Sequence, residues 1–209
     1  MVEVSAILLG AGESKRMGVD KLSLPWGKKT VFEHCLETLL RAKIKEVIVV
    51  FNNQMKWIRG HIKDQKVKVV INPYYRKGMS TSIRRGLQAV DPSSRGILIA
   101  LGDQPFLRTR TVNALIDAFL RRKNGIVVPS FRRKQGHPVI FHRRYIKELL
   151  RLRGDIGGRS IIEKHPEEVC LVCVKSEGVT KDIDTWKDYH PPTPPSPAGG
   201  EGEREGDRY

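Results

Sequence analysis

The sequence predicts an α/β fold in which helices cover both faces of a mostly parallel sheet. Short runs that are apolar at successive positions alternate along the chain with segments of helical periodicity. These runs are bounded by Gly, Asn or Asp, as expected for parallel strands that are buried on both faces. At 209 residues the chain is long enough for one domain with a sizeable core, and too short for two full enzyme domains.

The first half of the chain predicts strands that alternate with helices. The expected strands are 4–9, 46–51, 67–71 and 96–101, and the helical segments between them are 30–42, a stretch from Gln54 to Ile62, and 80–90. Right-handed crossovers between such units give a doubly wound sheet.

The second half predicts a different order of elements. The expected elements are a helix from Thr109 to Arg122, a strand over 126–129, an antiparallel strand over 138–141, helices over 143–152 and near Ser160, and a strand over 169–174. The antiparallel strand makes the sheet mixed. The expected architecture is therefore a single-domain, Rossmann-like three-layer sandwich with a mostly parallel mixed sheet.

The composition changes at the end of the chain. From His190 onward it is rich in Pro, Gly and charged residues and lacks apolar side chains that could form a core. The sequence therefore predicts a folded domain over 1–189 and a disordered tail over 190–209.

The net charge and the hydropathy of the chain limit the classes of ligand, macromolecule and membrane that it could bind. The net charge of +15 attracts polyanions, and nucleotides fit this requirement as well as nucleic acids do. The basic residues lie in short scattered groups without aromatic stacking motifs, so we expect no nucleic-acid partner. No apolar run approaches the roughly 20 residues that span a bilayer, and the first residues lack the features of a signal peptide. We expect a soluble, cytoplasmic protein without a membrane anchor.

Two cysteines, Cys170 and Cys173, have the spacing of a metal or redox motif. They lie in a predicted strand, where residues three apart point to opposite faces. We therefore expect two small core residues whose sulfur atoms diverge.

The loop after the first predicted strand combines glycines with basic residues. Gly10 and Gly12 permit close approach of backbone N–H groups to a phosphate or a base, and Arg16 and Lys21 add fixed positive charge. The loop matches neither the P-loop nor the dinucleotide-binding pattern, which disfavours both classes. Taken alone, it also fits a tight turn with scattered surface bases.

Carboxylates follow at two further points. Asp103 comes directly after the buried run 96–101, at the end of a central strand where open α/β sheets bind ligands. A helix cap is the alternative role for Asp103. Asp182 and Asp184 would face the same side of an extended segment and reach a hard cation together. Asp182 fits a surface turn equally well.

A polar segment opens the helix expected over 80–90. The hydroxyl and N–H groups of Ser80, Thr81 and Ser82 would form an anion site, and a plain helix cap explains them equally well. His137 precedes a proline at the start of a strand, where a structural role is also open.

The loop over residues 9–18, followed by Asp20-Lys21-Leu22, resembles the signature loop of the molybdenum cofactor nucleotidyltransferase family. The resemblance continues in order through nearly all of the chain before the tail. Its further motifs are Asn72-Pro73, Gly78-Met79-Ser80-Thr81-Ser82, Gly102-Asp103-Gln104-Pro105, Gly136-His137-Pro138, Gly154-Asp155-Ile156-Gly157-Gly158-Arg159 and Asp182-Ile183-Asp184-Thr185.

The resemblance implies roles for particular residues. Asp103 and Asp184 would hold Mg²⁺, and Arg16, Lys21 and Asp103 would act in catalysis. The nucleotide would be bound by Leu9, Gly10, Ala11, Gly12, Arg16, Lys21 and Gly102. The acceptor would be bound by Asn72, Ser80, Thr81, Ser82 and His137.

The resemblance also implies a reaction, the transfer of CMP from CTP to a molybdopterin-type cofactor with release of pyrophosphate. Alanine at position 11 goes with CTP in this family, although Gly10 departs from the alanine that is more common there. The alternatives are a guanylyltransferase for the same cofactor, a cytidylyltransferase for another small phosphorylated acceptor, and a module that binds CTP without turnover. Molybdenum enzymes or their chaperones are the implied protein partners.

Overall fold

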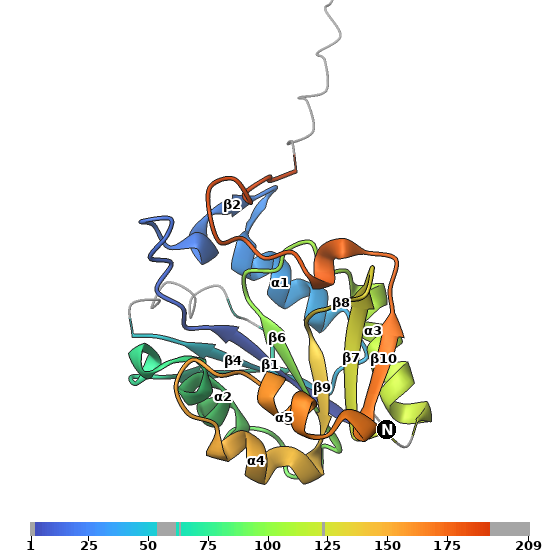
Figure 1. Cartoon of the computed structure of the whole chain (residues 1–209). Coiled ribbons are helices and arrows are strands. Elements are labelled where there is room, and N and C mark those ends of the chain that lie inside the picture. Colours follow the sequence, from blue (N-terminus) through green and yellow to red (C-terminus); the bar gives the residue numbers. More distant parts are fainter. Residues whose placement is uncertain (1–2, 54–61, 63, 123, 193–209) are drawn as a thin grey trace, which may run out of the picture.

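The computed structural model describes residues 3–53, 62, 64–122 and 124–192 (Figure 1). Its main sheet follows the order β10-β7-β9-β6-β1-β4-β5, with β8 paired to β7. The strands of this sheet are β1 Val4–Gly10, β4 Glu46–Phe51, β5 Val67–Ile71, β6 Gly96–Leu101, β7 Ile126–Phe131, β8 Lys134–Gln135, β9 Val139–His142 and β10 Val169–Cys173. A small separate hairpin is formed by β2 Pro25–Trp26 and β3 Lys29–Thr30.

The sheet is mixed and mostly parallel, as predicted. β1 pairs in parallel with β4 and β6, β4 with β5, and β7 with β10. β9 runs antiparallel to both of its neighbours, β6 and β7. The parallel pairings bring the carboxyl ends of β1, β4 and β6 to one edge of the sheet, where ligands bind in such folds.

Helices cover both faces of the sheet and complete the expected three layers (Figure 1). The α-helices are α1 Val31–Leu40, α2 Met79–Leu87, α3 Thr109–Arg121, α4 Ile146–Arg151 and α5 Arg159–Lys164. Short 3-10 turns are η1 Lys21–Ser23, η3 Tyr75–Lys77, η4 Arg143–Tyr145, η5 Pro166–Glu168 and η6 Glu177–Val179. None of the described helices is long and apolar enough to cross a membrane.

The side chains of successive β1 residues pack into two different hydrophobic cores, one on each face of the sheet. Ala6 and Leu8 pack with α1 and α3, whereas Ile7 and Leu9 pack with α2, α4 and α5. This explains why the run is apolar at every position rather than at alternate ones.

Local sequence sets the start of α1. The backbone N–H of Glu33 donates to Thr30 Oγ1 at 3.2 Å, and the Glu33 carboxylate accepts the Thr30 N–H at 2.8 Å. This reciprocal capping box satisfies N–H groups that would otherwise lack partners at the helix start. The helix therefore begins one residue later than the sequence pattern predicted.

Other expectations had mixed outcomes. Cys170 is buried as predicted, but Cys173 is exposed, because β10 is an edge strand whose alternate side chains face solvent. The helical stretch predicted from Gln54 lies outside the described residues except for Ile62. Of the predicted tail, only residues 190–192 are described.

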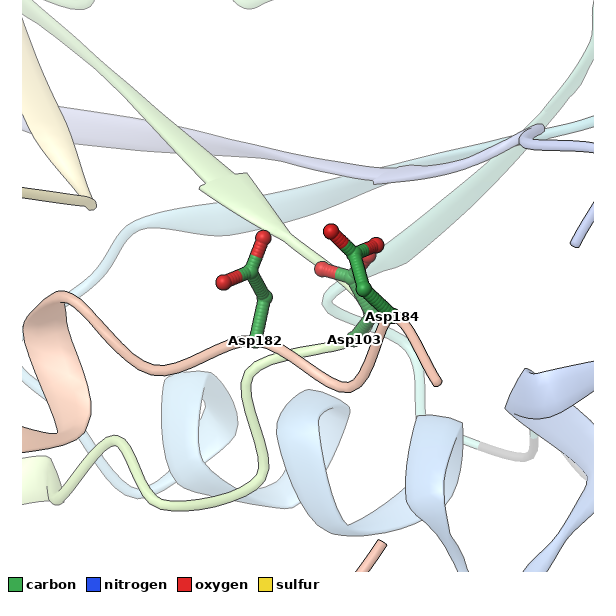
Figure 2. Close-up of side chains that lie close together, drawn as sticks. All are labelled: Asp103, Asp182 and Asp184. Carbon is green, nitrogen blue, oxygen red and sulfur yellow. The ribbon is translucent and has the colours of Figure 1, made fainter. Parts of the chain in front are cut away.

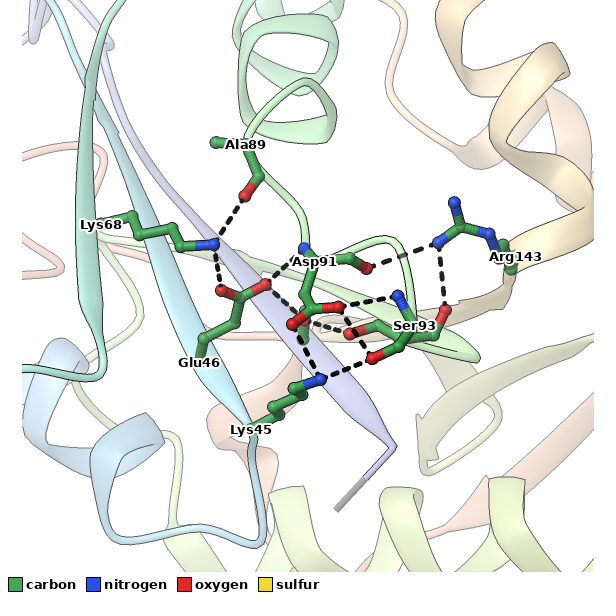
Figure 3. Close-up of polar contacts among 9 residues, drawn as sticks. Lys45, Glu46, Lys68, Ala89, Asp91, Ser93 and Arg143 are labelled. Carbon is green, nitrogen blue, oxygen red and sulfur yellow. Dashed lines mark hydrogen bonds and ion pairs between the residues drawn. The ribbon is translucent and has the colours of Figure 1, made fainter. Parts of the chain in front are cut away.

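At the amino ends of the parallel strands, Glu46 lies at the centre of a buried polar network (Figure 3). Glu46 opens β4 and is 7% exposed. Its carboxylate accepts the Ser5 hydroxyl at 2.8 Å and the Asp91 backbone N–H at 2.7 Å, and pairs with Lys68 at 2.6 Å. The network therefore ties β1, β4, β5 and the loop before β6 together.

The pKa of Glu46 is lowered. Burial acts to raise it, but the hydrogen bonds from Lys68, Asp91 and Ser5 outweigh burial. The ionised carboxylate therefore adds stability at neutral pH, and this contribution is lost as the pH falls below about 4.

We expect Glu46→Ala to lower the free energy of unfolding at pH 7 by about 1 to 3 kcal/mol, because buried donors lose their acceptor. Denaturant titration measures this change, and the difference from wild type should shrink at pH 3. Glu163→Ala is the matched control, since Glu163 is 63% exposed in its ion pair with Arg159. The control should cost less than about 0.5 kcal/mol. Equal losses in the two variants would contradict the buried network.

Candidate functional site

A cavity of about 730 Å³ opens at the carboxyl ends of β1 and β6. This volume suits a small ligand such as a nucleotide. The lining comes from the loop after β1, the turn before α2, the end of β6, and the segment that follows η6. The predicted residues in its wall are Leu9, Gly10, Ala11, Gly12, Arg16, Lys21, Ser82, Asp103 and Asp184.

An acidic cluster lies on one side of this cavity. Asp103, Asp182 and Asp184 each offer an oxygen within 4.8 Å of the others. Figure 2 shows Asp182 and Asp184 projecting to the same side of their segment. Between them, Ile183 is fully buried and its N–H donates to the Asp103 carbonyl at 2.9 Å. This alternation confirms the expectation that the two aspartates face one way.

Two basic side chains from the glycine loop meet the cluster. Lys21 Nζ lies 2.6 Å from Asp103 and 3.1 Å from Asp184, and Arg16 lies 2.9 Å from Asp184. Burial acts to lower the pKa of Lys21, but the two carboxylates outweigh burial and raise it. Lys21 therefore stays charged through the neutral range.

The cluster fits a divalent cation. Asp103 Oδ1 is buried and has no hydrogen-bond partner among the described residues, although its other oxygen binds Lys21. A buried carboxylate oxygen without a donor is costly unless a ligand satisfies it. Carboxylate oxygens are also the ligands that Mg²⁺ and Mn²⁺ prefer. These side chains are therefore able to hold such an ion.

The conformation of the glycine loop differs from the simplest expectation. Among the described residues of this loop, the left-handed positions are Ser14 (φ 50°) and Gly18 (φ 70°), not Gly10 or Gly12. A Cβ at Gly12 would meet nothing, so this glycine leaves its backbone open to the cavity. The Asn52 side chain donates to the Ala11 carbonyl at 3.3 Å and holds the loop against the end of β4.

Gly102 lies behind the cavity rather than in its wall. Its N–H donates to the Leu9 carbonyl at 2.8 Å, and a Cβ would lie 3.0 Å from that oxygen. Glycine therefore permits β6 to approach β1 closely and so sets the position of Asp103.

The residues predicted to bind the acceptor separate into different places. Asn72 is fully buried and donates to Thr81 at 2.8 Å and to Ser82 at 2.9 Å. Ser80 and Thr81 are also buried, and only Ser82 reaches the cavity wall. His137 lies in the wall of a second cavity. Their roles toward the acceptor stay predictions.

The expected free N–H groups at the start of α2 have partners within the protein. The Met79 N–H donates to the Asp155 carboxylate at 3.1 Å, and the Ser80 N–H donates to the Gly154 carbonyl at 3.2 Å. Gly78 permits this approach, with φ 98° and with Gly154 in the place of its missing Cβ. A protein carboxylate therefore occupies the helix terminus for which the sequence left an anion site and a plain helix cap equally open.

Sequence reasoning missed further residues of the cavity wall. Glu13 pairs with Arg76 at 3.2 Å and with Lys15 at 3.0 Å, which bridges the glycine loop and the turn before α2. Asp155 also lines the cavity. Position 155 belongs to one of the motifs quoted above, but no local pattern reveals a contact with α2 across 76 residues.

Cations that suit a polyphosphate and carboxylates that suit a divalent cation meet in one cavity, as the chemistry of a nucleotidyltransferase requires. Residues 6–169 match the model of the MobA-like NTP transferase domain. The chain belongs to this family.

The chain is also similar to individual proteins with different named activities. The chain is 28% identical over 191 residues to nicotine blue oxidoreductase of Paenarthrobacter nicotinovorans, covering 87% of this chain and 92% of the relative. It is 24% identical over 140 residues to the molybdenum cofactor cytidylyltransferase of Escherichia coli, covering 67% and 70% of the two chains. A Mycobacterium tuberculosis protein crystallised with manganese superposes with a TM-score of 0.74 at 28% identity, covering 90% and 95%.

Asp182 offers a test of the electrostatic cost of the cluster. Its pKa is raised, first by burial and then by the charges of Asp103 and Asp184. A raised folded-state pKa means that ionised Asp182 destabilises the fold once the pH exceeds about 3.9.

We expect Asp182→Asn to raise the Tm at pH 7 by a few degrees in metal-free buffer, because it removes this unfavourable charge. The gain should disappear at pH 3, where Asp182 is protonated in both states. Asp117→Asn, in an exposed ion pair with Lys43, is the control and should change little. A lowered Tm at pH 7 for Asp182→Asn would refute this account of the cluster.

Proposed function

We propose that the chain is a soluble, cytoplasmic cytidylyltransferase that moves CMP from CTP to a molybdopterin-type cofactor and releases pyrophosphate. The observation that carries the proposal is the meeting of Arg16 and Lys21 with the acidic cluster, in the cavity that the glycine loop lines. Cations for a polyphosphate and carboxylates for a metal ion are both needed when two anionic substrates react.

The proposed chemistry needs no general base. The acceptor phosphate is already anionic at neutral pH, so one of its oxygens attacks the α-phosphorus directly and pyrophosphate leaves. Lys21 and Arg16 stabilise the negative charge that develops on the leaving pyrophosphate. Before a metal ion binds, Asp103 and Asp184 outweigh the effect of burial and raise the pKa of Lys21, so Lys21 is charged when the substrates arrive.

A divalent cation, Mg²⁺ in this proposal, would be held by Asp103 and Asp184. When bound, it screens the two anions from each other and stabilises charge on the transferred phosphoryl group. The buried, unpartnered Oδ1 of Asp103 supports this role. Asp182 lies close enough to contribute a further oxygen.

The base assignment depends on Ala11. Its backbone carbonyl accepts a hydrogen bond from Asn52, and Ala11 is one of the residues that line the cavity, although it is only 6% exposed. A methyl group at this point takes space that a purine would need, so the smaller cytosine is favoured. The guanylyltransferase alternative corresponds to a wider pocket, as glycine at this position would give.

The acceptor assignment has support from the named activity of the Escherichia coli relative. Products of this enzyme would pass to molybdenum enzymes or their chaperones. Another small phosphorylated acceptor is the alternative within the same reaction class. A redox activity, as named for the Paenarthrobacter relative, is the alternative from another class.

Pyrophosphate release tests these possibilities together. The purified protein is given each of the four NTPs, with MgCl₂ and with or without molybdopterin. The proposal expects release with CTP that requires the acceptor. Release with another phosphorylated acceptor would replace the substrate only, and reduction of a dye by a nicotinamide coenzyme without pyrophosphate would replace the class.

The metal ligands have a separate test. We expect Asp103→Asn and Asp184→Asn each to lower kcat by more than the roughly 10- to 100-fold that is typical of outer-shell partners of a metal, because each removes a charged ligand. MgCl₂ or MnCl₂ should raise the Tm of wild type through mass action, and less so in either variant. Asp117→Asn is again the control. Near-normal kcat in a folded variant would remove that residue from the metal site.

The base is tested at Ala11. We expect wild type to prefer CTP over GTP, and Ala11→Gly to relax this preference by roughly 10-fold to 200-fold at most, because one methyl contact is worth about 1 to 3 kcal/mol. The measurement is the ratio of kcat/KM for the two nucleotides in each protein. Equal ratios would show that position 11 does not read the base, and a wild-type preference for GTP would overturn the choice of CTP.

A further inference from the structure

The protein's own cations bind the oxygens of the acidic cluster. Lys21 Nζ contacts Oδ2 of Asp103 at 2.6 Å and Oδ1 of Asp184 at 3.1 Å, and Arg16 contacts the other oxygen of Asp184 at 2.9 Å. The cluster of Asp103, Asp182 and Asp184 carries three negative charges, and these two side chains balance two of them. A lysine ammonium group therefore bridges the same two carboxylates that would share a divalent cation.

Lys21 and Arg16 differ in how firmly they hold the cluster. The Lys21 side chain is 12% exposed and bridges two aspartates, whereas the Arg16 side chain is 68% exposed and contacts Asp184 alone. Water and salt screen an exposed ion pair, so the Arg16 contact contributes little. Lys21 is therefore the main cation with which a metal ion would compete.

A metal ion and the Lys21 ammonium group need the same oxygens. Oδ1 of Asp103 has no hydrogen-bond partner among the described residues, but both oxygens of Asp184 contact cations. Magnesium ligands lie only about 2.1 Å from the ion, so an ion bound to Asp184 would lie within a few ångströms of Lys21 Nζ. Like charges at that separation repel strongly where water is largely excluded.

The backbone at Lys21 is fixed, so only its side chain has to move. The Lys21 N–H donates to the Ser14 hydroxyl at 3.2 Å, and the Leu22 N–H donates to the Asp20 carboxylate at 3.1 Å. Leu22 is itself buried in the core on the α1 side. A lysine ammonium group has three donors on a flexible four-carbon stem. It can therefore turn toward another ligand in the same cavity while η1 stays folded.

We propose that Lys21 is a competing internal cation, which keeps divalent metal ions weakly bound until a nucleoside triphosphate enters the cavity. The triphosphate draws the ammonium group away from Asp103 and Asp184, because it carries more negative charge than these two carboxylates together. The released oxygens are then available to the metal ion, so metal and nucleotide bind cooperatively. This inference rests on the proposed function only for the triphosphate as the ligand that attracts Lys21.

Binding of Mn²⁺ to the full chain without nucleotide tests the competition, with free Mn²⁺ measured by electron paramagnetic resonance. We expect Lys21→Met to lower the Kd for Mn²⁺ by roughly 10-fold or more, because methionine lacks the competing charge. Lys21→Arg keeps the charge, and its Kd should stay within about 3-fold of wild type. Lys43→Met is the matched control, since it removes a lysine from an ion pair with Asp117 outside the cavity. Its Kd should change less than about 2-fold.

Three results of this titration would overturn the proposal. A Kd for Lys21→Met equal to or above that of wild type would show that Lys21 does not compete with the metal ion. Equal tightening by Lys43→Met would show that net charge alone explains the effect. Equal tightening by Lys21→Arg would show that the charge at position 21 is not the cause. Circular dichroism checks that each variant is folded before it is titrated.

The wild-type protein offers a second test that needs no folded Lys21→Met variant. Nuclear magnetic resonance of ¹⁵N-labelled lysine side chains detects ammonium groups held by carboxylates, and Lys21→Arg identifies the signal of Lys21. We expect this signal to shift when MgCl₂ is added to saturation and also when CTP is added in EDTA. A signal that MgCl₂ leaves unchanged would refute the competition, and one that CTP leaves unchanged would refute the role of the triphosphate.

The failure of this proposal can be distinguished from the failure of the proposed function. The Mn²⁺ titration contains neither nucleotide nor acceptor, so its result does not depend on the reaction. Competition at Lys21 without pyrophosphate release from any NTP would remove the cytidylyltransferase assignment and keep the competing cation. Pyrophosphate release from CTP without competition would keep the enzyme and remove this role of Lys21.

Discussion

The ammonium group of Lys21 holds the site together. It contacts Asp103 and Asp184, which belong to the end of β6 and to the last described segment of the chain, 163 residues from Lys21 in the second case. A buried ion pair is stabilising only when each charge has a partner of opposite sign. The loop after β1, the carboxyl end of β6 and the segment with Ile183 therefore have to pack in one register. The shape of the nucleotide-sized cavity follows from that requirement.

The main fold could be predicted from sequence because its longer strands are apolar runs with clear limits. The two-residue strands β2, β3 and β8 have no such pattern and were not expected. The antiparallel β9 was recognisable, since Pro138 and the short spacing leave no room for a crossover helix. The site was only partly predictable. Asp103 and Lys21 follow strand ends, where the topology itself gathers side chains. The carboxylate of Asp155 at the start of α2, and the placement of His137 in a second cavity, depend on contacts between segments that no local pattern encodes.

The two cavities differ in the side chains that line them. The first is lined by charged groups and by exposed backbone, which suits a triphosphate that any NTP carries. The second has an apolar floor, and its wall also contains Arg133, Lys134, Arg159 and Glu163. The segment 154–158 contacts the start of α2 on one side and Phe141 on the other, since a Cβ at Gly158 would meet that ring. A shift of this segment would therefore change the shape of both cavities, since Asp155 lines the first and Gly158 lines the second.

The position of Asp184 near the end of the domain has a consequence for biosynthesis. The segment that carries Asp184 is held to the β2–β3 hairpin by Tyr189. The Tyr189 hydroxyl donates to the Pro25 carbonyl, and the ring centroids of Tyr189 and Trp26 are 6.2 Å apart. A ribosome releases this segment only after every strand of the sheet has emerged. The nascent chain can therefore fold its sheet first, and it holds an incomplete carboxylate cluster until Asp184 has emerged.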